Sequence, residues 1–286
     1  MSIFVYDKNN PLIKVLIINT AVFILMLFIQ LVSFLFTGNS QVFLNPVVHF
    51  LAVPASLKKL LFHFWSPITY MFLHTDFWHF FFNMLWLYFG GLMFVMYIDS
   101  RKLIPLYILG GLSGAVLFIL SYNIFPVFLP VRQGSYALGA SASITAIIIA
   151  IAVYQPLTDV YLFGVFRMKL FWIAIFFVIW DLFSIMGDNA GGHIAHLGGA
   201  IFGYFFAYYL KRGKDITSIL QNFNFKTSHR KKYHFNMRTS NDKEYNENVH
   251  QIRKELDRIL EKISKHGYKR LSKKEREFLN KYKDYF

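Results

Sequence analysis

The chain has 286 residues, 55% of them hydrophobic and 16% charged, and a formal net charge of +14. A soluble domain carries about a quarter of its residues as charged side chains, so this composition excludes an ordinary soluble protein and indicates a membrane protein. Residues 211–286 hold 21 of the 30 Lys and Arg residues and 10 of the 16 acidic ones, so most of the positive charge lies in the tail. The absence of cysteine excludes disulfides, a thiolate nucleophile and a sulfur-ligated metal.

Six apolar stretches in residues 1–212 predict an all-α membrane domain with six transmembrane helices. The first stretch is too long for the hydrophobic part of a cleaved signal peptide, so we expect it to be retained. A semi-apolar segment rich in Phe, Leu and Trp but interrupted by prolines follows it, which favours an amphipathic loop in the membrane interface. The predicted helices cover residues 12–36, 77–98, 103–125, 139–155, 170–187 and 190–210.

The tail divides into two parts. Residues 213–247 are polar and basic without a hydrophobic period, which predicts a linker. In residues 248–286 apolar side chains recur at helical spacing, and Ser272 precedes Glu275 by three positions in a capping-box pattern. We therefore expect a small cytoplasmic helical hairpin at the C-terminus, after the six-helix domain of residues 1–212.

The distribution of Lys and Arg predicts the orientation in the membrane. If the N-terminus is cytoplasmic, the inner loops and the tail hold most of the basic residues, and the outer loops keep only Lys58, Lys59 and Arg132. The positive-inside rule therefore places both termini in the cytoplasm. We interpret the basic tail as a solvated topology signal rather than a site for anionic lipid headgroups. Nucleic-acid binding is not expected, because no recognisable module is present.

Polar residues of three predicted helices share one depth. In this orientation the second, fourth and sixth helices run inward, and His79, Ser141 and His196 lie within about two turns of their starts, roughly 10 Å from the outer surface. A neutral imidazole beside a serine hydroxyl can take its proton as the oxygen attacks a carbonyl. His79 and Asn83 share a helix face, and with the Ser141 backbone N–H they are candidate donors to the oxyanion.

Three motifs in order along the chain resemble those of the rhomboid intramembrane serine proteases. They are HFFFNM from His79 to Met84, GASA around Ser141, and AHLGG around His196 followed by Gly203. The resemblance implies a six-helix rhomboid-like bundle with a Ser141–His196 dyad that lacks an acidic third member. It also implies an oxyanion hole formed by His79, Asn83 and the Ser141 amide, and no cofactor.

The resemblance further implies substrates and location. Family substrates are single-span membrane proteins, cut in or beside their transmembrane helix. We therefore expect transmembrane protein substrates, residence in the lipid bilayer of a bacterial cytoplasmic (inner) membrane, and an active site that opens to the outer side.

The chain departs from the family pattern at three places. Ser66 follows Trp65 where the family often has arginine in its first loop. Ala142 replaces the frequent glycine after the nucleophile and is expected to crowd the oxyanion amide slightly. Thr145 occupies a position where an aromatic ring often stacks on the histidine. These departures bear on rate and on the orientation of His196 rather than on the dyad.

Two further polar residues and three alternative functions are compatible with parts of the sequence. Asp181 is placed deep in the fifth helix, below the dyad, with a packing or interhelical role. His193 is interpreted as a structural residue or as a pH-sensitive neighbour of His196. A metalloprotease built on His74, His79, His193 and His196 with Asp181 is disfavoured, because the HExxH type needs a glutamate and none precedes Glu244. A rhomboid-like protein that binds transmembrane clients without cutting them stays open as the alternative. A transporter is disfavoured because the polar groups avoid the midplane.

Overall fold

The computed structural model describes residues 10–162, 166–221, 258–259, 262–263, 271–272 and 275–278. The chain divides into two compact units, residues 1–225 and 226–286. Most of the predicted linker and hairpin lies outside the described residues, so their structure stays a prediction. In the second unit the predicted capping box is confirmed: the Ser272 amide donates to Glu275 Oε2 at 2.7 Å, and the Glu275 amide donates to Ser272 Oγ at 3.3 Å.

Each of the six apolar stretches forms a helix whose ends lie within a few residues of the predicted ones. These helices are α1 (Pro11–Thr37), α5 (Phe77–Tyr97), α6 (Leu103–Ile124), α7 (Ser141–Tyr154), α8 (Leu170–Ser184) and α9 (Ala190–Leu210). Within the described chain, three segments are long and apolar enough to cross a membrane: Pro11–Thr37, Phe77–Tyr97 and Ser100–Ile124. The helices α7 and α8 are apolar but have only 14 and 15 residues.

Local sequence explains where the helices begin and end. Asn10 caps α1 with its side-chain oxygen, and Pro11 occupies the first helical position, where a missing N–H costs nothing. Gly38 ends α1 with a left-handed φ of 70°. Asp76 and Asn189 cap α5 and α9 in the same way as Asn10 caps α1. The caps of α5 and α9 fix the first turns of the two helices that carry the predicted site histidines.

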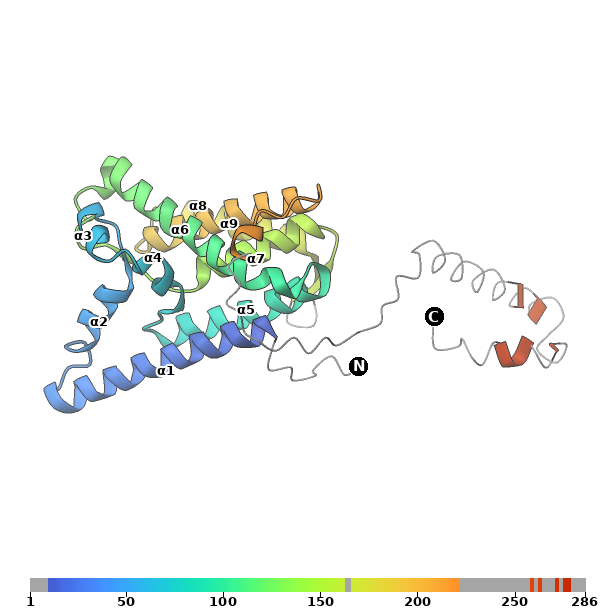
Figure 1. The fold of residues 1–286 in the computed structure, drawn as a ribbon, viewed down its shortest axis with the longest axis horizontal. Helices are drawn as coiled ribbons and strands as arrows, with labels where there is room; N and C mark the ends of the chain where they lie inside the picture. Colours follow the sequence, from blue (N-terminus) through green and yellow to red (C-terminus); the bar gives the residue numbers. More distant parts are fainter. Residues whose placement is uncertain are drawn as a thin grey trace. The chain divides into compact units, whose positions relative to one another are not determined.

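The short helix α7 lies at the centre of the first unit and contacts α5, α6, α8 and α9 (Figure 1). Ten of its 14 residues are buried, as expected for a helix that is apolar on all sides. Glycines let its neighbours approach closely. A β-carbon added to Gly110 of α6 would stand 2.3 Å from Ala146 Cβ, and one added to Gly203 of α9 would stand 2.3 Å from the Ala146 carbonyl oxygen.

The segment between α1 and α5 is folded into short helices rather than an open loop. They are α2 (Leu44–Leu51), α3 (Leu57–Phe62), α4 (Ser66–Thr69) and the 3₁₀ turn η1 (Tyr70–Phe72). Between α2 and α3, strand β1 (Val53–Pro54) pairs antiparallel with β2 (Tyr136–Ala137), with Val53 opposite Ala137. This pairing ties the first connecting segment to the backbone that leads into α7.

The first unit is mostly helical, as expected for the family fold, and it also contains two short antiparallel strand pairs. The loop expected around Arg167 and Lys169 forms an antiparallel pair of β3 (Asp159–Leu162) and β4 (Phe166–Lys169). The Asp159 carboxylate accepts from Arg167 Nη2 at 2.5 Å and lies 2.7 Å from Lys169 Nζ. These cations lower the Asp159 pKa to about 2. The cross-strand charges explain why a polar connection adopts strand pairing. The remaining short elements are η2 (Ser100–Lys102), η3 (Pro126–Phe128) and α10 (Ser218–Gln221).

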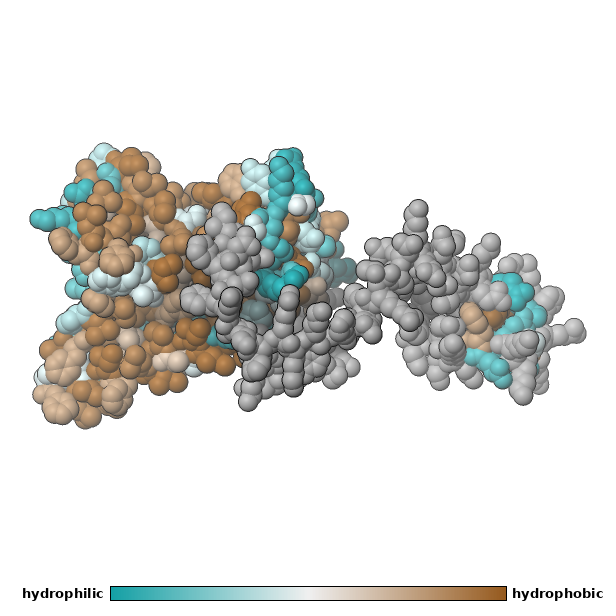
Figure 2. Space-filling model, in the orientation of Figure 1, coloured by the Kyte–Doolittle hydropathy of each residue, from teal (hydrophilic) through white to brown (hydrophobic). Residues whose placement is uncertain are grey.

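The outer surface of the first unit is apolar. Large hydrophobic side chains are exposed on α1, α5 and α8, among them Phe28, Leu35, Trp78, Trp172 and Phe183. Figure 2 shows hydrophobic side chains over much of the visible face of this unit. Contiguous apolar surface of this extent is unfavourable in water and suits the hydrocarbon of a bilayer.

Candidate active site

The segment before α7 holds Ser141 at the first position of that helix. Gly139 has a φ of 116°, a left-handed conformation that glycine adopts without strain. The Gly139 amide donates to the Tyr70 carbonyl at 2.9 Å, and the Ala140 amide donates to His74 Nε2 at 3.4 Å. The backbone that presents Ser141 is therefore anchored on both residues that precede it.

His74 accepts the Ala140 amide because its imidazole is neutral. The residue is fully buried in the connection between η1 and α5. Burial, with a smaller contribution from the nearby His79, lowers the pKa of His74 to about 4. At neutral pH its Nε2 therefore keeps a lone pair for the amide hydrogen.

His79 lies directly over Gly139. A β-carbon added to Gly139 would stand 2.8 Å from His79 Cε1, so only glycine leaves room for the ring at this distance. Asp76 holds the start of α5 by accepting the His79 amide at 2.8 Å. One turn further along α5, Asn83 is buried and its Nδ2 donates to the His79 carbonyl at 2.7 Å. One N–H of the Asn83 amide is left for another acceptor.

The glycines of α9 bring His196 to α7. A β-carbon added to Gly199 would stand 2.0 Å from the carbonyl oxygen of Ala142, so the two helices touch at their backbones. Ser113 of α6 donates to the Gly198 carbonyl at 2.8 Å on the other side. This close packing brings the histidine one turn before Gly199 to the N-terminal end of α7.

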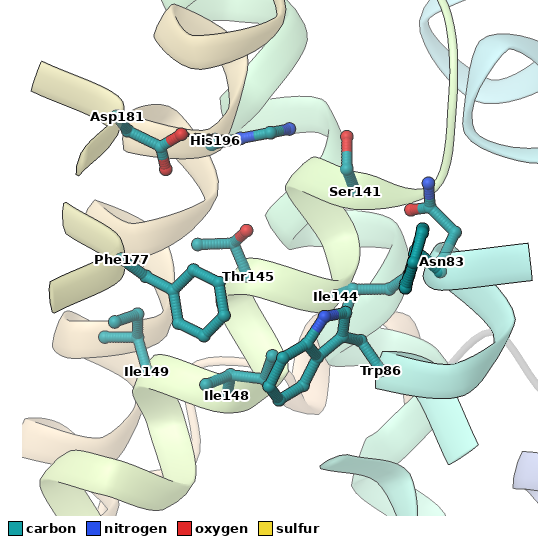
Figure 3. Close-up of a pocket in the computed structure, with 11 residues that line it drawn as sticks. Asn83, Trp86, Ser141, Ile144, Thr145, Ile148, Ile149, Phe177, Asp181 and His196 are labelled. Carbon is teal, nitrogen blue, oxygen red and sulfur yellow. Dashed lines mark hydrogen bonds and ion pairs between the residues drawn. The ribbon is translucent and has the colours of Figure 1, made fainter. Parts of the chain in front are cut away.

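The four residues predicted for the site line one cavity of about 390 Å³. Ser141 comes from α7, His196 from α9, and His79 and Asn83 from α5, and the wall is completed by Tyr136, Ala137, Leu138, Asn189 and Gly192. The structure thus brings all four together. In Figure 3 the His196 imidazole lies between the Asp181 carboxylate and the Ser141 hydroxyl. Among the described residues, no hydrogen bond joins Ser141 to His196.

A second, apolar cavity of about 130 Å³ adjoins the first at Asn83, Ser141 and His196. It extends between α5, α7 and α8, where Trp86 and Phe177 face each other edge to face with ring centroids 5.0 Å apart. The remaining wall is formed by Phe82, Ile144, Thr145, Ile148, Ile149 and Asp181. A polar chamber therefore continues into a space suited to an apolar side chain.

Comparisons with known proteins identify the family of the chain. A model of the Rhomboid domain family matches residues 61–213, more than half of the chain. The chain belongs to the rhomboid family. It is also similar to the RHOMBOID-like protein 12, mitochondrial, of Arabidopsis thaliana, with 30% identity over 142 residues, which are 46% of this chain and 42% of that protein. A model of a family of unknown function (DUF6576) matches residues 239–284.

The family and the apolar helices establish a mostly helical integral membrane protein. The chain spans less than half the length of the curated relative that it matches. The match to this relative therefore does not assign an activity, substrates or partners to this rhomboid-family protein. The evidence for them is the chemistry of its own site.

Asp181 is the residue that the sequence interpretation misplaced. It lies near the C-terminal end of α8, and its Oδ1 is 2.9 Å from His196 Nδ1 and 2.7 Å from His193 Nδ1. The depth assigned to it was wrong, because α8 runs opposite to α9 and ends beside the start of α9. The signal was present in the sequence: a short connection between antiparallel helices places Asp181 across from positions 193 and 196.

The histidines of the alternative metal site fall into two groups. Of the described residues, Asp181, His193 and His196 form a group whose possible ligand atoms all lie within 4.8 Å of one another. His74 and His79 form a separate pair, with ring centroids 5.2 Å apart.

The structure shows the contacts made at the three positions where the chain departs from the rhomboid pattern. The Trp65 indole donates to the Phe50 carbonyl at 2.8 Å, so the first connecting segment is anchored without an arginine after Trp65. The Ala142 methyl lies 2.6 Å from a β-carbon added to Gly114, so it points toward α6 and away from the cavity, contrary to the expected crowding of the oxyanion amide. Thr145 lines the apolar cavity.

Proposed function

We propose that the protein is an intramembrane serine endopeptidase that hydrolyses peptide bonds in or next to transmembrane segments. The observation that carries the proposal is the single cavity lined by Ser141, His196, His79 and Asn83 from three helices. Rhomboid-family proteins are generally serine proteases, which supports the reaction class. The cavity combines a nucleophile, a base and donors, as acyl transfer requires.

The reaction would proceed in two halves. His196 Nε2 takes the proton of the Ser141 hydroxyl as the oxygen attacks the carbonyl carbon of the peptide, and a tetrahedral intermediate forms. Its collapse breaks the C–N bond, and the proton on His196 passes to the leaving amine. A water molecule then attacks the acyl-Ser141 ester with His196 again as the base, which releases the new carboxyl terminus and restores the hydroxyl.

The oxyanion would be held by the Ser141 amide, His79 and Asn83. The neighbouring amides of Gly139 and Ala140 already donate to Tyr70 and His74. The Ser141 amide, in the first turn of α7, has no intrahelical acceptor and lies at the positive end of the helix dipole. Preorganised donors of this kind are worth about 3–4 kcal/mol each in transition-state stabilisation.

Six membrane-spanning helices with both termini in the cytoplasm complete the proposal. The positive-inside distribution supports this orientation, which turns the N-terminal ends of α5, α7 and α9 toward the outer side. With 14 residues, α7 is about 21 Å long, which is less than the ~30 Å hydrocarbon layer. The helix can therefore begin at Ser141 below the outer surface of the membrane. Substrates would be transmembrane proteins whose helix opens locally to expose a carbonyl. The bacterial inner membrane is the proposed location, while the similar Arabidopsis protein is named as mitochondrial.

The deciding experiment compares the wild type with Ser141→Ala in detergent, using a model transmembrane substrate and a fluorophosphonate label. Ser143 supplies a matched control, since it lies two residues further along α7, fully buried and outside both cavities. We expect the wild type and Ser143→Ala to cleave and to take the label, and Ser141→Ala to do neither. Cleavage by Ser141→Ala would exclude the serine mechanism. A stable wild type that binds the substrate without cleavage or labelling would support the alternative, a client-binding protein.

A further inference from the structure

One carboxylate oxygen contacts both histidines at the start of α9. Asp181 is 5% exposed, and its Oδ1 lies 2.9 Å from His196 Nδ1 and 2.7 Å from His193 Nδ1. Both distances are those of hydrogen bonds with a charged partner. The two histidines are separated by three positions on α9, so they present their rings to the same side, where α8 packs.

The contact determines which nitrogen of His196 carries hydrogen. An ionised carboxylate only accepts hydrogen bonds, so the nitrogen that faces it must be the donor. With Nδ1 protonated, the neutral His196 ring keeps its lone pair on Nε2. Figure 3 shows one ring nitrogen of His196 turned toward Asp181 and the other toward the side on which Ser141 lies. The general base therefore has its acceptor atom in the cavity.

The same three side chains are a poor match to a bound zinc ion. Two ligands at about 2.0–2.1 Å from a tetrahedral zinc stand roughly 3.3 Å apart. The 2.7 Å and 2.9 Å separations are shorter, as expected when a hydrogen atom rather than a metal ion lies between oxygen and nitrogen. Hydrogen bonds from the two imidazoles to the carboxylate account for both contacts.

We propose that Asp181 is a positioning residue that completes a Ser141–His196–Asp181 arrangement. This inference rests on the proposed protease function and goes beyond a two-residue dyad. Asp181 fixes the ring orientation and the Nδ1–H tautomer of His196. When Nε2 takes the Ser141 proton, the carboxylate stabilises the imidazolium, and the proton then leaves for the amine. Asp181 accepts the Nδ1–H hydrogen bond throughout, and no proton is transferred to it.

The test uses the full chain with Asp181→Leu, which keeps the branched shape of the side chain but has no hydrogen-bond acceptor, and Asp181→Asn as a second variant. Histidine ¹⁵N spectroscopy reads the His196 tautomer directly, also in a Ser141→Ala background. We expect Nδ1–H in the wild type and loss of this preference in Asp181→Leu. On a model transmembrane substrate, we expect kcat to fall at least ~10-fold in both variants with KM unchanged, because the base is misoriented while substrate docking is intact.

His193→Gln is the matched control, since it removes the other donor to the same oxygen. We expect it to keep the His196 tautomer and to retain kcat within about threefold. The proposal is overturned if Asp181→Leu and Asp181→Asn keep the wild-type kcat, if His196 stays Nδ1–H in Asp181→Leu, or if His193→Gln loses as much kcat as Asp181→Leu. A zinc chelator that changes wild-type cleavage but not that of Asp181→Leu would assign the carboxylate to a metal and also overturn it. Absent cleavage by the wild type would contradict the protease function itself, whereas the tautomer is read without any turnover.

Discussion

The backbone of Gly199 in α9 rests against the carbonyl of Ala142 in α7, so closely that an added β-carbon would stand 2.0 Å from that oxygen. This contact joins the helix that carries His196 to the helix that starts at Ser141. Real β-carbons do not approach backbone atoms to this distance, and a methyl group can be accommodated only if the helices move apart. The distance between the proposed base and nucleophile therefore depends on a residue that lines neither cavity.

Gly199→Ala should destabilise the fold and disable the site together. Overpacking costs about 1–3 kcal/mol, and we expect the upper end because the clash is with backbone rather than with a flexible side chain. Thermal unfolding in detergent should show the loss, and fluorophosphonate labelling should fall because α9 is displaced. Gly134→Ala is the control, since its added β-carbon would have its nearest neighbour at 3.9 Å. An unchanged melting temperature and labelling rate in Gly199→Ala would contradict the described packing.

Asn83→Ala should lower kcat by about 100-fold with little change in KM, as expected when one donor to an oxyanion is removed. The prediction follows from the burial of Asn83 beside the cavity and from the N–H that its bond to the His79 carbonyl leaves free. Steady-state kinetics on a model transmembrane substrate give the measurement. A rise in KM at constant kcat would instead assign Asn83 to substrate binding.

The helices and the members of the site were predictable from sequence because both depend on local patterns. Long apolar stretches predict transmembrane helices, because the core of a soluble protein does not need stretches of that length. A serine and a histidine inside such stretches indicate a catalytic site. The position of Asp181 was missed, although the alternating direction of successive spans already places residue 181 near the outer end of its helix. The β3–β4 pairing depends on Asp159 of one strand meeting Arg167 and Lys169 of the other, and no period in the sequence reveals such a contact.

Acidification should weaken the fold through His74. Its pKa is about 4 in the folded chain and 6.5 as the ordinary value, so the unfolded chain binds the proton more readily. The free energy of unfolding therefore falls as the pH is lowered from 6.5 toward 4, by about 3 kcal/mol over the full window, and is unaffected by His74 above it. Thermal unfolding across this window should show a flatter pH dependence for His74→Gln than for the wild type. Parallel curves for the two proteins would rule out His74 as the titrating group.

Trp86 of α5 and Phe177 of α8 should limit the rate at which transmembrane substrates reach the site. The two rings meet edge to face at 5.0 Å beside the apolar cavity, where α5 and α8 otherwise make little contact. An aromatic pair of this kind is worth about 0.5–1.5 kcal/mol, so Trp86→Ala or Phe177→Ala should speed cleavage of a transmembrane substrate about 2- to 10-fold if the helices must part for entry. Labelling by a small fluorophosphonate should stay unchanged, because that probe needs no such opening. Trp172→Ala is the control, because Trp172 is an exposed tryptophan on α8, the helix that carries Phe177. Equal acceleration of cleavage and labelling would point to a general loosening of the site, and slower cleavage would exclude entry between these helices.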